Sequence, residues 1–137
     1  MSELIAFYLG QSPDNRGRFI SDIWAYNHVQ LEQVHDFIQW LFPAYEPSMF
    51  NPSAPILTQQ DISEFKNNTV LRDAVKRSFA LMTNFYGFAF SEDALRKAEK
   101  SSMLWITPGN HNFLRITRIL KFLVAIDMRK LALQFFD

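Results

Sequence analysis

The chain has 137 residues, of which 48% are hydrophobic and 15% aromatic, and its 14 basic and 14 acidic residues give a formal net charge of zero. A chain of this length fits one domain, residues 1–137, that buries about two-thirds of the surface its unfolded form exposes. The lack of cysteine excludes disulfides, thiolate catalysis and cysteine-ligated zinc, and the balanced charge disfavours a nucleic-acid partner.

The N-terminal region predicts two short helical segments separated by a polar loop. An apolar stretch over Glu3–Leu9 predicts a helix that ends at Gly10, and Gln11–Arg18 follows as the loop. Ser21 is suited to cap a brief helix that runs on to Tyr26. The start of the chain carries an acidic residue where a secretory signal would carry basic ones, so we expect it to belong to the fold and expect a cytoplasmic location.

The segment Val29–Phe42 predicts one helix, which we expect at the centre of the fold. Its apolar residues recur at helical spacing, and Pro43 ends it. Residues 43–57 contain four prolines, too many for a helix or a paired strand. Because this stretch also carries apolar residues, it predicts an ordered loop that lies on the core. Those residues are Met49, Phe50, Ile56 and Leu57.

The C-terminal half predicts further helices. Thr58 followed by Asp61 predicts a helix start, and Thr69–Tyr86 predicts a long amphipathic helix closed by Gly87. Residues 91–93 predict the start of another helix that carries Leu95 and Ala98, and residues 112–136 predict a last helical region broken near Asp127. The pattern as a whole predicts a single compact orthogonal all-α domain of about six to seven helices.

A row of polar residues follows the predicted central helix. It consists of His28, Glu32, His35, Asp36 and Gln39, and lies between two apolar faces of the helical wheel. Three interpretations stay open: a buried polar network that fixes helix packing, a solvated edge, or a metal site. For a metal site, the spacing of His28, Glu32 and His35 would let their imidazole and carboxylate groups converge on one ion. Asp36 would join them in a metal-dependent hydrolase.

The start of the last helix carries a second group of polar residues. Asn110 or Asn112 can cap this helix, and Arg115 and Arg118 follow within its first two turns, so the exposed N–H groups and the two arginines predict an anion site. Arg115 falls between apolar positions of the wheel. A guanidinium in that setting pairs with Asp36 or Glu32, binds a phosphate or carboxylate ligand, or is exposed.

Other chemical signatures are absent from the sequence. It contains no glycine-rich phosphate loop, no nucleophile elbow and no His-Glu-x-x-His motif, and it has no apolar run of the ~20 residues needed to span a bilayer. Residues 1–66 hold eight acids and three bases, whereas residues 67–137 hold eleven bases and six acids. This division indicates either two halves with complementary fields or a basic surface for an anionic partner.

Several runs of residues together resemble the conserved domain of the opioid growth factor receptor family. These are His35–Pro43 (HDFIQWLFP), Glu46-Pro47-Ser48, Asn51-Pro52, Ala54-Pro55, Phe85-Tyr86-Gly87 and the stretch from Asn110 to Lys121. They occur in the family's order and cover roughly residues 18–123. The resemblance implies a domain like that of the animal receptors, which bind an enkephalin peptide and are associated with the nucleus and its envelope. It implies no catalytic residue and no cofactor.

We therefore expect a non-enzymatic binding module for a peptide or a small anionic ligand. The predicted pocket lies where the central helix, the proline-rich loop and the start of the last helix meet. Its candidate residues are Asp36, Trp40, Phe50, Asn51, Asn112, Arg115 and Arg118. The alternatives are the metal-dependent hydrolase and a structural or oligomer-forming domain.

Overall fold

The structure, a computed structural model, describes residues 2–34, 36–45, 54–86, 88–91, 94–97 and 112–136. Within these ranges the chain forms eight helices and one antiparallel pair of short strands, so the predicted all-α class is confirmed. The elements are α1 (Glu3–Tyr8), α2 (Ile20–Trp24), α3 (His28–Gln33), α4 (Ile38–Leu41), α5 (Gln59–Asn67), α6 (Thr69–Phe85), β1 (Phe88–Ser91), β2 (Ala94–Lys97), α7 (Asn112–Ala125) and α8 (Arg129–Phe136).

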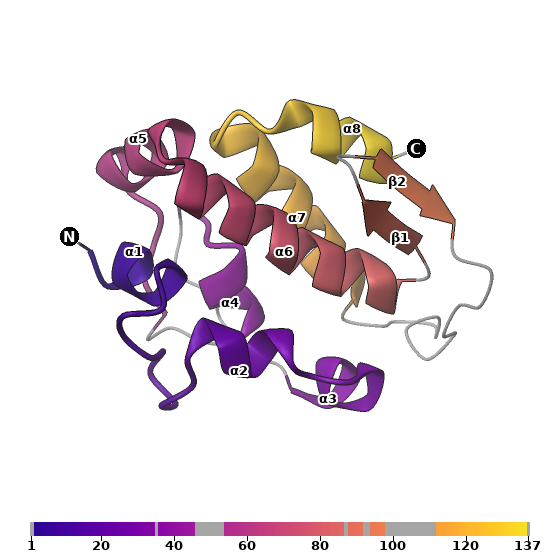
Figure 1. Cartoon of the computed structure of the whole chain (residues 1–137), viewed down its shortest axis with the longest axis horizontal. Coiled ribbons are helices and arrows are strands. Elements are labelled where there is room, and N and C mark those ends of the chain that lie inside the picture. Colours follow the sequence, from indigo (N-terminus) through magenta and orange to yellow (C-terminus); the bar gives the residue numbers. More distant parts are fainter. Residues whose placement is uncertain are drawn as a thin grey trace.

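The longest helix, α6, runs across the middle of the molecule (Figure 1). It packs against α1, α2, α5 and β1, while α8 packs against α7 and β2. In the view of Figure 1, α1 to α4 lie below α6, and the two strands lie near its C-terminal end. The central position that the sequence predicted for residues 29–42 is therefore held by α6.

The segment predicted as one helix over Val29–Phe42 is two short helices, and this prediction is wrong. Helix α3 ends at Gln33, Val34 is extended with φ −87° and ψ 127°, and α4 begins at Ile38. The side chain of Arg115 reaches the carbonyls of Leu31 and Val34, and so satisfies backbone acceptors that a continuous helix would have used itself. A single helical wheel therefore does not apply to this segment.

Local hydrogen bonds confirm the predicted start of α5 and correct that of α2. Thr58 Oγ1 accepts from the Asp61 N–H and the Asp61 carboxylate accepts from the Thr58 N–H, each at 3.1 Å, which forms a capping box. In α2 the cap is Phe19 rather than Ser21, because the Asp22 carboxylate accepts from the Phe19 N–H at 2.8 Å. Gly10, with φ +77°, follows the end of α1 as predicted.

The helix predicted from residue 91 onward is a second error, because Ala94–Lys97 is strand β2. It pairs with Phe88–Ser91 in the register Phe88↔Lys97. Phe88 and Phe90 are two residues apart and so lie on one face of β1. Their rings make edge contacts with Phe135 and Phe79, and this packing of alternate residues favours a strand.

Both ends of the proline-rich segment lie against the fold, while residues 46–53, with Met49 and Phe50, lie outside the described residues. The Leu57 N–H donates to the Ala44 carbonyl at 2.8 Å and holds the two ends together. Ala54 and Leu57 are buried, as predicted for a segment lying on the core, whereas Ile56 is exposed.

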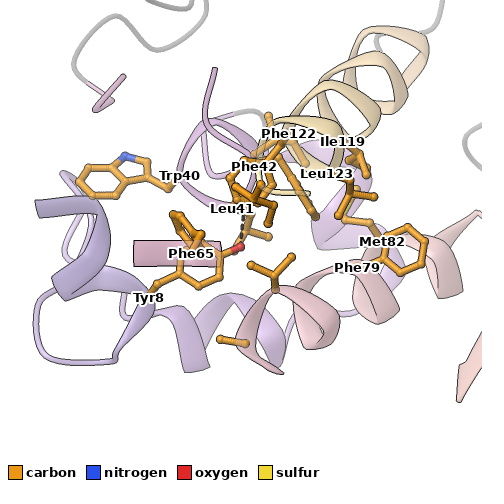
Figure 2. Close-up of a cluster of buried hydrophobic side chains, with 14 of the residues drawn as sticks. Tyr8, Trp40, Leu41, Phe42, Phe65, Phe79, Met82, Ile119, Phe122 and Leu123 are labelled. Carbon is orange, nitrogen blue, oxygen red and sulfur yellow. Dashed lines mark hydrogen bonds between the residues drawn. The ribbon is translucent and has the colours of Figure 1, made fainter. Parts of the chain in front are cut away.

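An aromatic core joins the N-terminal helices to α7. The Phe122 ring lies 5.9 Å from that of Phe42 and 5.3 Å from that of Phe65. Phe65 in turn contacts Tyr8 edge to face at 5.2 Å. Figure 2 shows these rings in one cluster with Trp40, Met82 and Ile119. The predicted break near Asp127 is confirmed, because that residue has φ 62° between α7 and α8.

Candidate functional site

The two arginines of α7 that the sequence placed at an anion site contact backbone carbonyls of the short helices. Arg115 is 4% exposed and donates to the carbonyls of Leu31 and Val34, and its guanidinium lies 5.2 Å from the centre of the Phe37 ring. Arg118 donates through Nε to the carbonyl of Phe42 at 2.7 Å. A cation at a helix C-terminus is favourable, because unpaired carbonyls and the helix dipole make that end negative.

Burial lowers the pKa of Arg115, while Tyr86 and Glu32 act in the opposite direction. Burial also lowers the pKa of Arg118. Both guanidinium groups keep their charge, since arginine is not deprotonated in proteins. The sequence predicted Asp36 or Glu32 as the partner of Arg115. The charge of Glu32 raises the pKa of Arg115, and the hydrogen bonds of Arg115 to Leu31 and Val34 are made to main-chain oxygens.

The carboxylate of Asp36 belongs to a charge network with the N-terminal loop. It accepts from Arg18 Nη1 at 2.8 Å and from Arg16 Nε at 2.9 Å, and Arg18 also binds Asp14 at 2.7 Å. Partial burial raises the pKa of Asp36, but hydrogen bonding to Arg18 and the charges of Arg18 and Arg16 outweigh this and hold the pKa below its usual value. Asp36 thus ties residues 14–18 to the connection between α3 and α4.

The remaining predicted pocket residues have a mixed outcome. Trp40 is 2% exposed, and its indole N–H donates to Asn15 Oδ1 at 3.1 Å. Phe50 and Asn51 lie outside the described residues, and the side chain of Asn112 is not described. The structure therefore brings Asp36, Trp40, Arg115 and Arg118 to the neighbourhood of α3 and α4 through structural contacts, and their ligand binding stays a prediction.

The polar row from His28 to Gln39 is divided among separate environments. His28 Nε2 lies 3.0 Å from Asn84 Oδ1 on α6. Gln39 is 3% exposed, and its Oε1 is the buried side-chain polar atom without a hydrogen-bond partner in the described part of the chain. No group of three histidine, aspartate or glutamate side chains among the described residues is placed to hold a metal. His35 lies outside those residues, so the proposed set of His28, Glu32 and His35 stays a prediction.

A cleft that the sequence did not single out opens between α2, α3 and α6. Its volume is about 680 Å³. The side formed by α2, α3 and the turn between them carries Trp24, Tyr26, Asn27, His28 and Leu31, and the opposite side carries Arg77, Ala80, Leu81 and Asn84 of α6 with Phe90 of β1. The sequence predicted an amphipathic helix here, but nothing in it showed that α2 and α3 lie beside Arg77 and Asn84.

The indole of Trp24 is fixed in the wall of this cleft by a buried chain of hydrogen bonds. Its Nε1 donates to Ser78 Oγ at 3.0 Å, Ser78 Oγ lies 3.3 Å from Tyr8 Oη, and the Tyr8 hydroxyl donates to the Leu41 carbonyl at 2.5 Å. Because a phenol has one proton, Ser78 must supply the proton between the two hydroxyls. Burial raises the pKa of Tyr8, with Ser78 opposing this effect.

Arg77 of α6 lies over the same indole. Its guanidinium carbon is 4.6 Å from the ring centre of Trp24. His28, which also lines the cleft, is within hydrogen-bond distance of Asn84 and makes an edge contact with the Phe85 ring at 5.6 Å. The lining of the cleft therefore combines aromatic rings, a cation and a pair of polar side chains.

Comparison with known proteins gives one consistent result. Residues 4–136 match the profile described as the opioid growth factor receptor (OGFr) conserved region. The chain is 38% identical over 120 residues to the opioid growth factor receptor of Rattus norvegicus, which covers 82% of this chain and 20% of the rat protein. For the human receptor the identity is 36% over 123 residues, with 82% of this chain and 18% of the human protein covered.

A second group of relatives shares the match. The opioid growth factor receptor-like protein 1 of Mus musculus is 32% identical over 130 residues, with 85% of this chain and 27% of the mouse protein covered. The chain thus spans about a fifth to a quarter of the length of these relatives. No solved structure matches it. None of its described helices has the length and apolar character that crossing a bilayer requires.

Proposed function

The chain belongs to the opioid growth factor receptor conserved-region family, and from that premise we propose that it is a non-enzymatic binding domain whose peptide ligand occupies the cleft between α2, α3 and α6. The relatives are named as receptors for a growth factor of the opioid class. The chain matches only about a fifth of the rat receptor. We therefore extend receptor activity to this chain as a proposal.

The observation that carries the proposal is the cleft itself. Its volume of about 680 Å³ lies in the range of ligand sites, which are mostly apolar with a few placed polar groups. Trp24, Tyr26 and Phe90 supply large apolar surfaces, and Asn27 and Asn84 supply amide groups. An extended peptide needs both, because its side chains require apolar contact and its backbone requires hydrogen-bond partners.

Hydrogen bonds to buried residues fix the Trp24 side chain, which lines the cleft. The chain of hydrogen bonds from Trp24 through Ser78 and Tyr8 to Leu41 connects α2, α6, α1 and α4. A side chain that is already fixed loses little entropy when a ligand packs on it. This arrangement supports binding to a preformed surface, whereas a catalytic role for the cleft lacks any corresponding arrangement among its described side chains.

The direct test is a titration of the protein with an enkephalin peptide, followed through the amide resonances of α6 and the indole N–H resonance of Trp24. We expect saturable shifts confined to the cleft. At a ligand concentration 100 times the dissociation constant, the peptide should stabilise the folded chain by about 2.7 kcal/mol.

A variant that fills the cleft separates specific binding from surface association. Ala80→Phe places a ring in the cleft and should weaken peptide binding at least about tenfold, which corresponds to about 1.4 kcal/mol. Val70→Phe adds the same ring to the same helix at a position that is 63% exposed and outside the cleft, and binding should be unchanged. Equal binding by both variants and the parent chain would place the ligand elsewhere and reject the proposal.

A further inference from the structure

Arg77 differs from most other arginines in what its guanidinium contacts. Arg16 and Arg18 bind carboxylates, and Arg72, Arg115 and Arg118 donate to backbone carbonyls. Arg77 is exposed and stacks on Trp24. Within the described part of the chain it has no hydrogen bond or ion pair, so its N–H donors have no acceptor among these residues.

The stack gives this guanidinium a defined position. The Trp24 indole is itself held by its hydrogen bond to Ser78 at 3.0 Å, and Ser78 is the residue next to Arg77 on α6. A guanidinium that lies over an aromatic ring keeps its in-plane N–H groups available. The Arg77 side chain is thus ordered by the ring and still able to donate two parallel hydrogen bonds.

The electrostatic setting favours an anion. The described residues that line the cleft include no aspartate or glutamate, so Arg77 supplies the formal charge there. Among the described lining residues, an anionic group entering the cleft meets one arginine and no acidic side chain. The planar fork of a guanidinium matches a carboxylate in shape and in the number of bonds made.

We propose that Arg77 is the specificity-determining residue of the cleft and binds a carboxylate of the ligand, while an apolar side chain of the same ligand packs beside Trp24 and Phe90. The inference rests on the proposed function, because it names the chemical class of peptide that the cleft selects. Carboxylates come from two sources in a peptide, the C-terminus and an acidic side chain, and both satisfy the same fork.

Three small probes distinguish these cases: N-acetyl-phenylalanine, its primary amide, and the amide of N-acetyl-aspartyl-phenylalanine. Each is titrated against the full chain, with the Trp24 indole N–H resonance as the reporter. The free acid should bind about fivefold more tightly than the primary amide, since a partly exposed ion pair contributes up to about 1 kcal/mol. If the aspartyl probe binds as tightly as the free acid, the cleft accepts any carboxylate of a peptide. If it binds as weakly as the primary amide, the cleft accepts only a C-terminal carboxylate.

Variants at Arg77 then test its role directly. Arg77→Gln should remove the difference between acid and amide, and Arg77→Lys should restore only part of it, because lysine keeps the charge and loses the fork. Arg129→Gln removes an exposed arginine on α8 and should leave the difference intact. Salt should weaken binding of the acid and not of the amide.

The possible failures are distinguishable. Equal binding of acid and amide by the parent chain would overturn the carboxylate inference and leave a peptide-binding cleft. If none of the probes shifts cleft resonances while all shift others, the cleft is not the binding site and the proposed function fails with the inference. Loss of the preference in Arg129→Gln as well as Arg77→Gln would show general charge attraction and overturn the assignment to Arg77.

Discussion

Arginine side chains from the two long helices satisfy the carbonyls at the ends of other helices. Arg72 of α6 donates to Ile126 and Asp127, where α7 ends, and Arg115 of α7 donates to Leu31 and Val34, where α3 ends. Each contact gives a helix C-terminus the cation that its dipole favours. Arg115 falls between apolar positions of the helical wheel, which indicated a buried partner or ligand, but only the fold shows that the carbonyls of α3 are its acceptors.

We expect the hydrogen bonds of Arg115 to the α3 carbonyls to stabilise the fold. Arg115→Met keeps most of the side-chain volume and leaves the Leu31 and Val34 carbonyls without this donor, so we expect a loss of about 3 kcal/mol in the free energy of unfolding. Urea denaturation followed by circular dichroism measures it. Arg129→Met on the surface of α8 is the control and should change stability by less than about 0.5 kcal/mol. Equal effects would show that Arg115 does not act through α3.

Asp36 makes stability depend on pH. Its pKa is lower in the folded chain than in the unfolded chain, so the unfolded chain binds the proton more readily. The stability that Asp36 contributes is therefore present above its unfolded-state pKa of about 4 and is lost as the pH falls through its folded-state pKa. Asp36→Asn should cost about 1 kcal/mol at pH 7, because the pairs are partly exposed, and the difference from the parent should shrink toward pH 2. Denaturation at a series of pH values measures this, and a difference from the parent that stays constant at low pH would contradict the role of Asp36.

Several helices are too short to be stable by themselves, and tertiary contacts decide where they begin and end. Helix α4 spans only Ile38–Leu41 and α3 only His28–Gln33, whereas isolated helices of fewer than about 12 residues are marginal in water. Local caps were readable in the sequence at Thr58 and Asp61, because their side chains bond to the backbone three residues away. The break between α3 and α4 was not readable, because its cause lies about 80 residues further along the chain.

The capping residue of α5 also connects two elements. Asp61 is 2% exposed, accepts from the Thr58 N–H, and accepts from Ser2 Oγ at 2.6 Å, and Ser2 in turn caps α1. Asp61→Ala should therefore cost about 2 kcal/mol, more than the ~1 kcal/mol of an ordinary cap. Hydrogen exchange should show faster opening of α1 as well as of α5. Thr58→Ala is the comparison, and protection of α1 unchanged in both variants would contradict the connection through Ser2.

At the scale of the whole molecule, aromatic rings join segments that are far apart in sequence. Phe122 of α7 contacts Phe42 next to α4 and Phe65 of α5, and Figure 2 shows the cluster formed by these rings. Because the described helices bury their apolar faces against one another, we expect these contacts to make the domain unfold as one cooperative unit. Aromatic residues make up 15% of the sequence, and the fold determines which of their rings meet.

Phe122→Ala should cost about 3–5 kcal/mol, because it removes a buried ring and leaves a cavity between elements. The loss is comparable to the whole stability of a small domain, so the transition midpoint should fall for every element together. Circular dichroism and tryptophan fluorescence measure this as coincident curves. Val124→Ala, two residues away on the same helix and 47% exposed, should change stability by less than about 0.5 kcal/mol. Separate transitions would contradict a single unit.

The sequence by itself determined the helical class, the family, the long amphipathic helix, the cap at Thr58 and the break near Asp127. These features depend on hydrophobic periodicity and on side chains that bond to nearby backbone, both of which act over a few residues. Tertiary structure decided the division of residues 29–42, the pairing of β1 with β2, and the cleft between α2, α3 and α6. The division of residues 29–42 and the cleft arise where surfaces distant in sequence meet, and β1, although close to β2 in sequence, packs on the distant rings of Phe79 and Phe135. The partner of Arg115 and the surface beside Arg77 therefore exist only once the chain has packed.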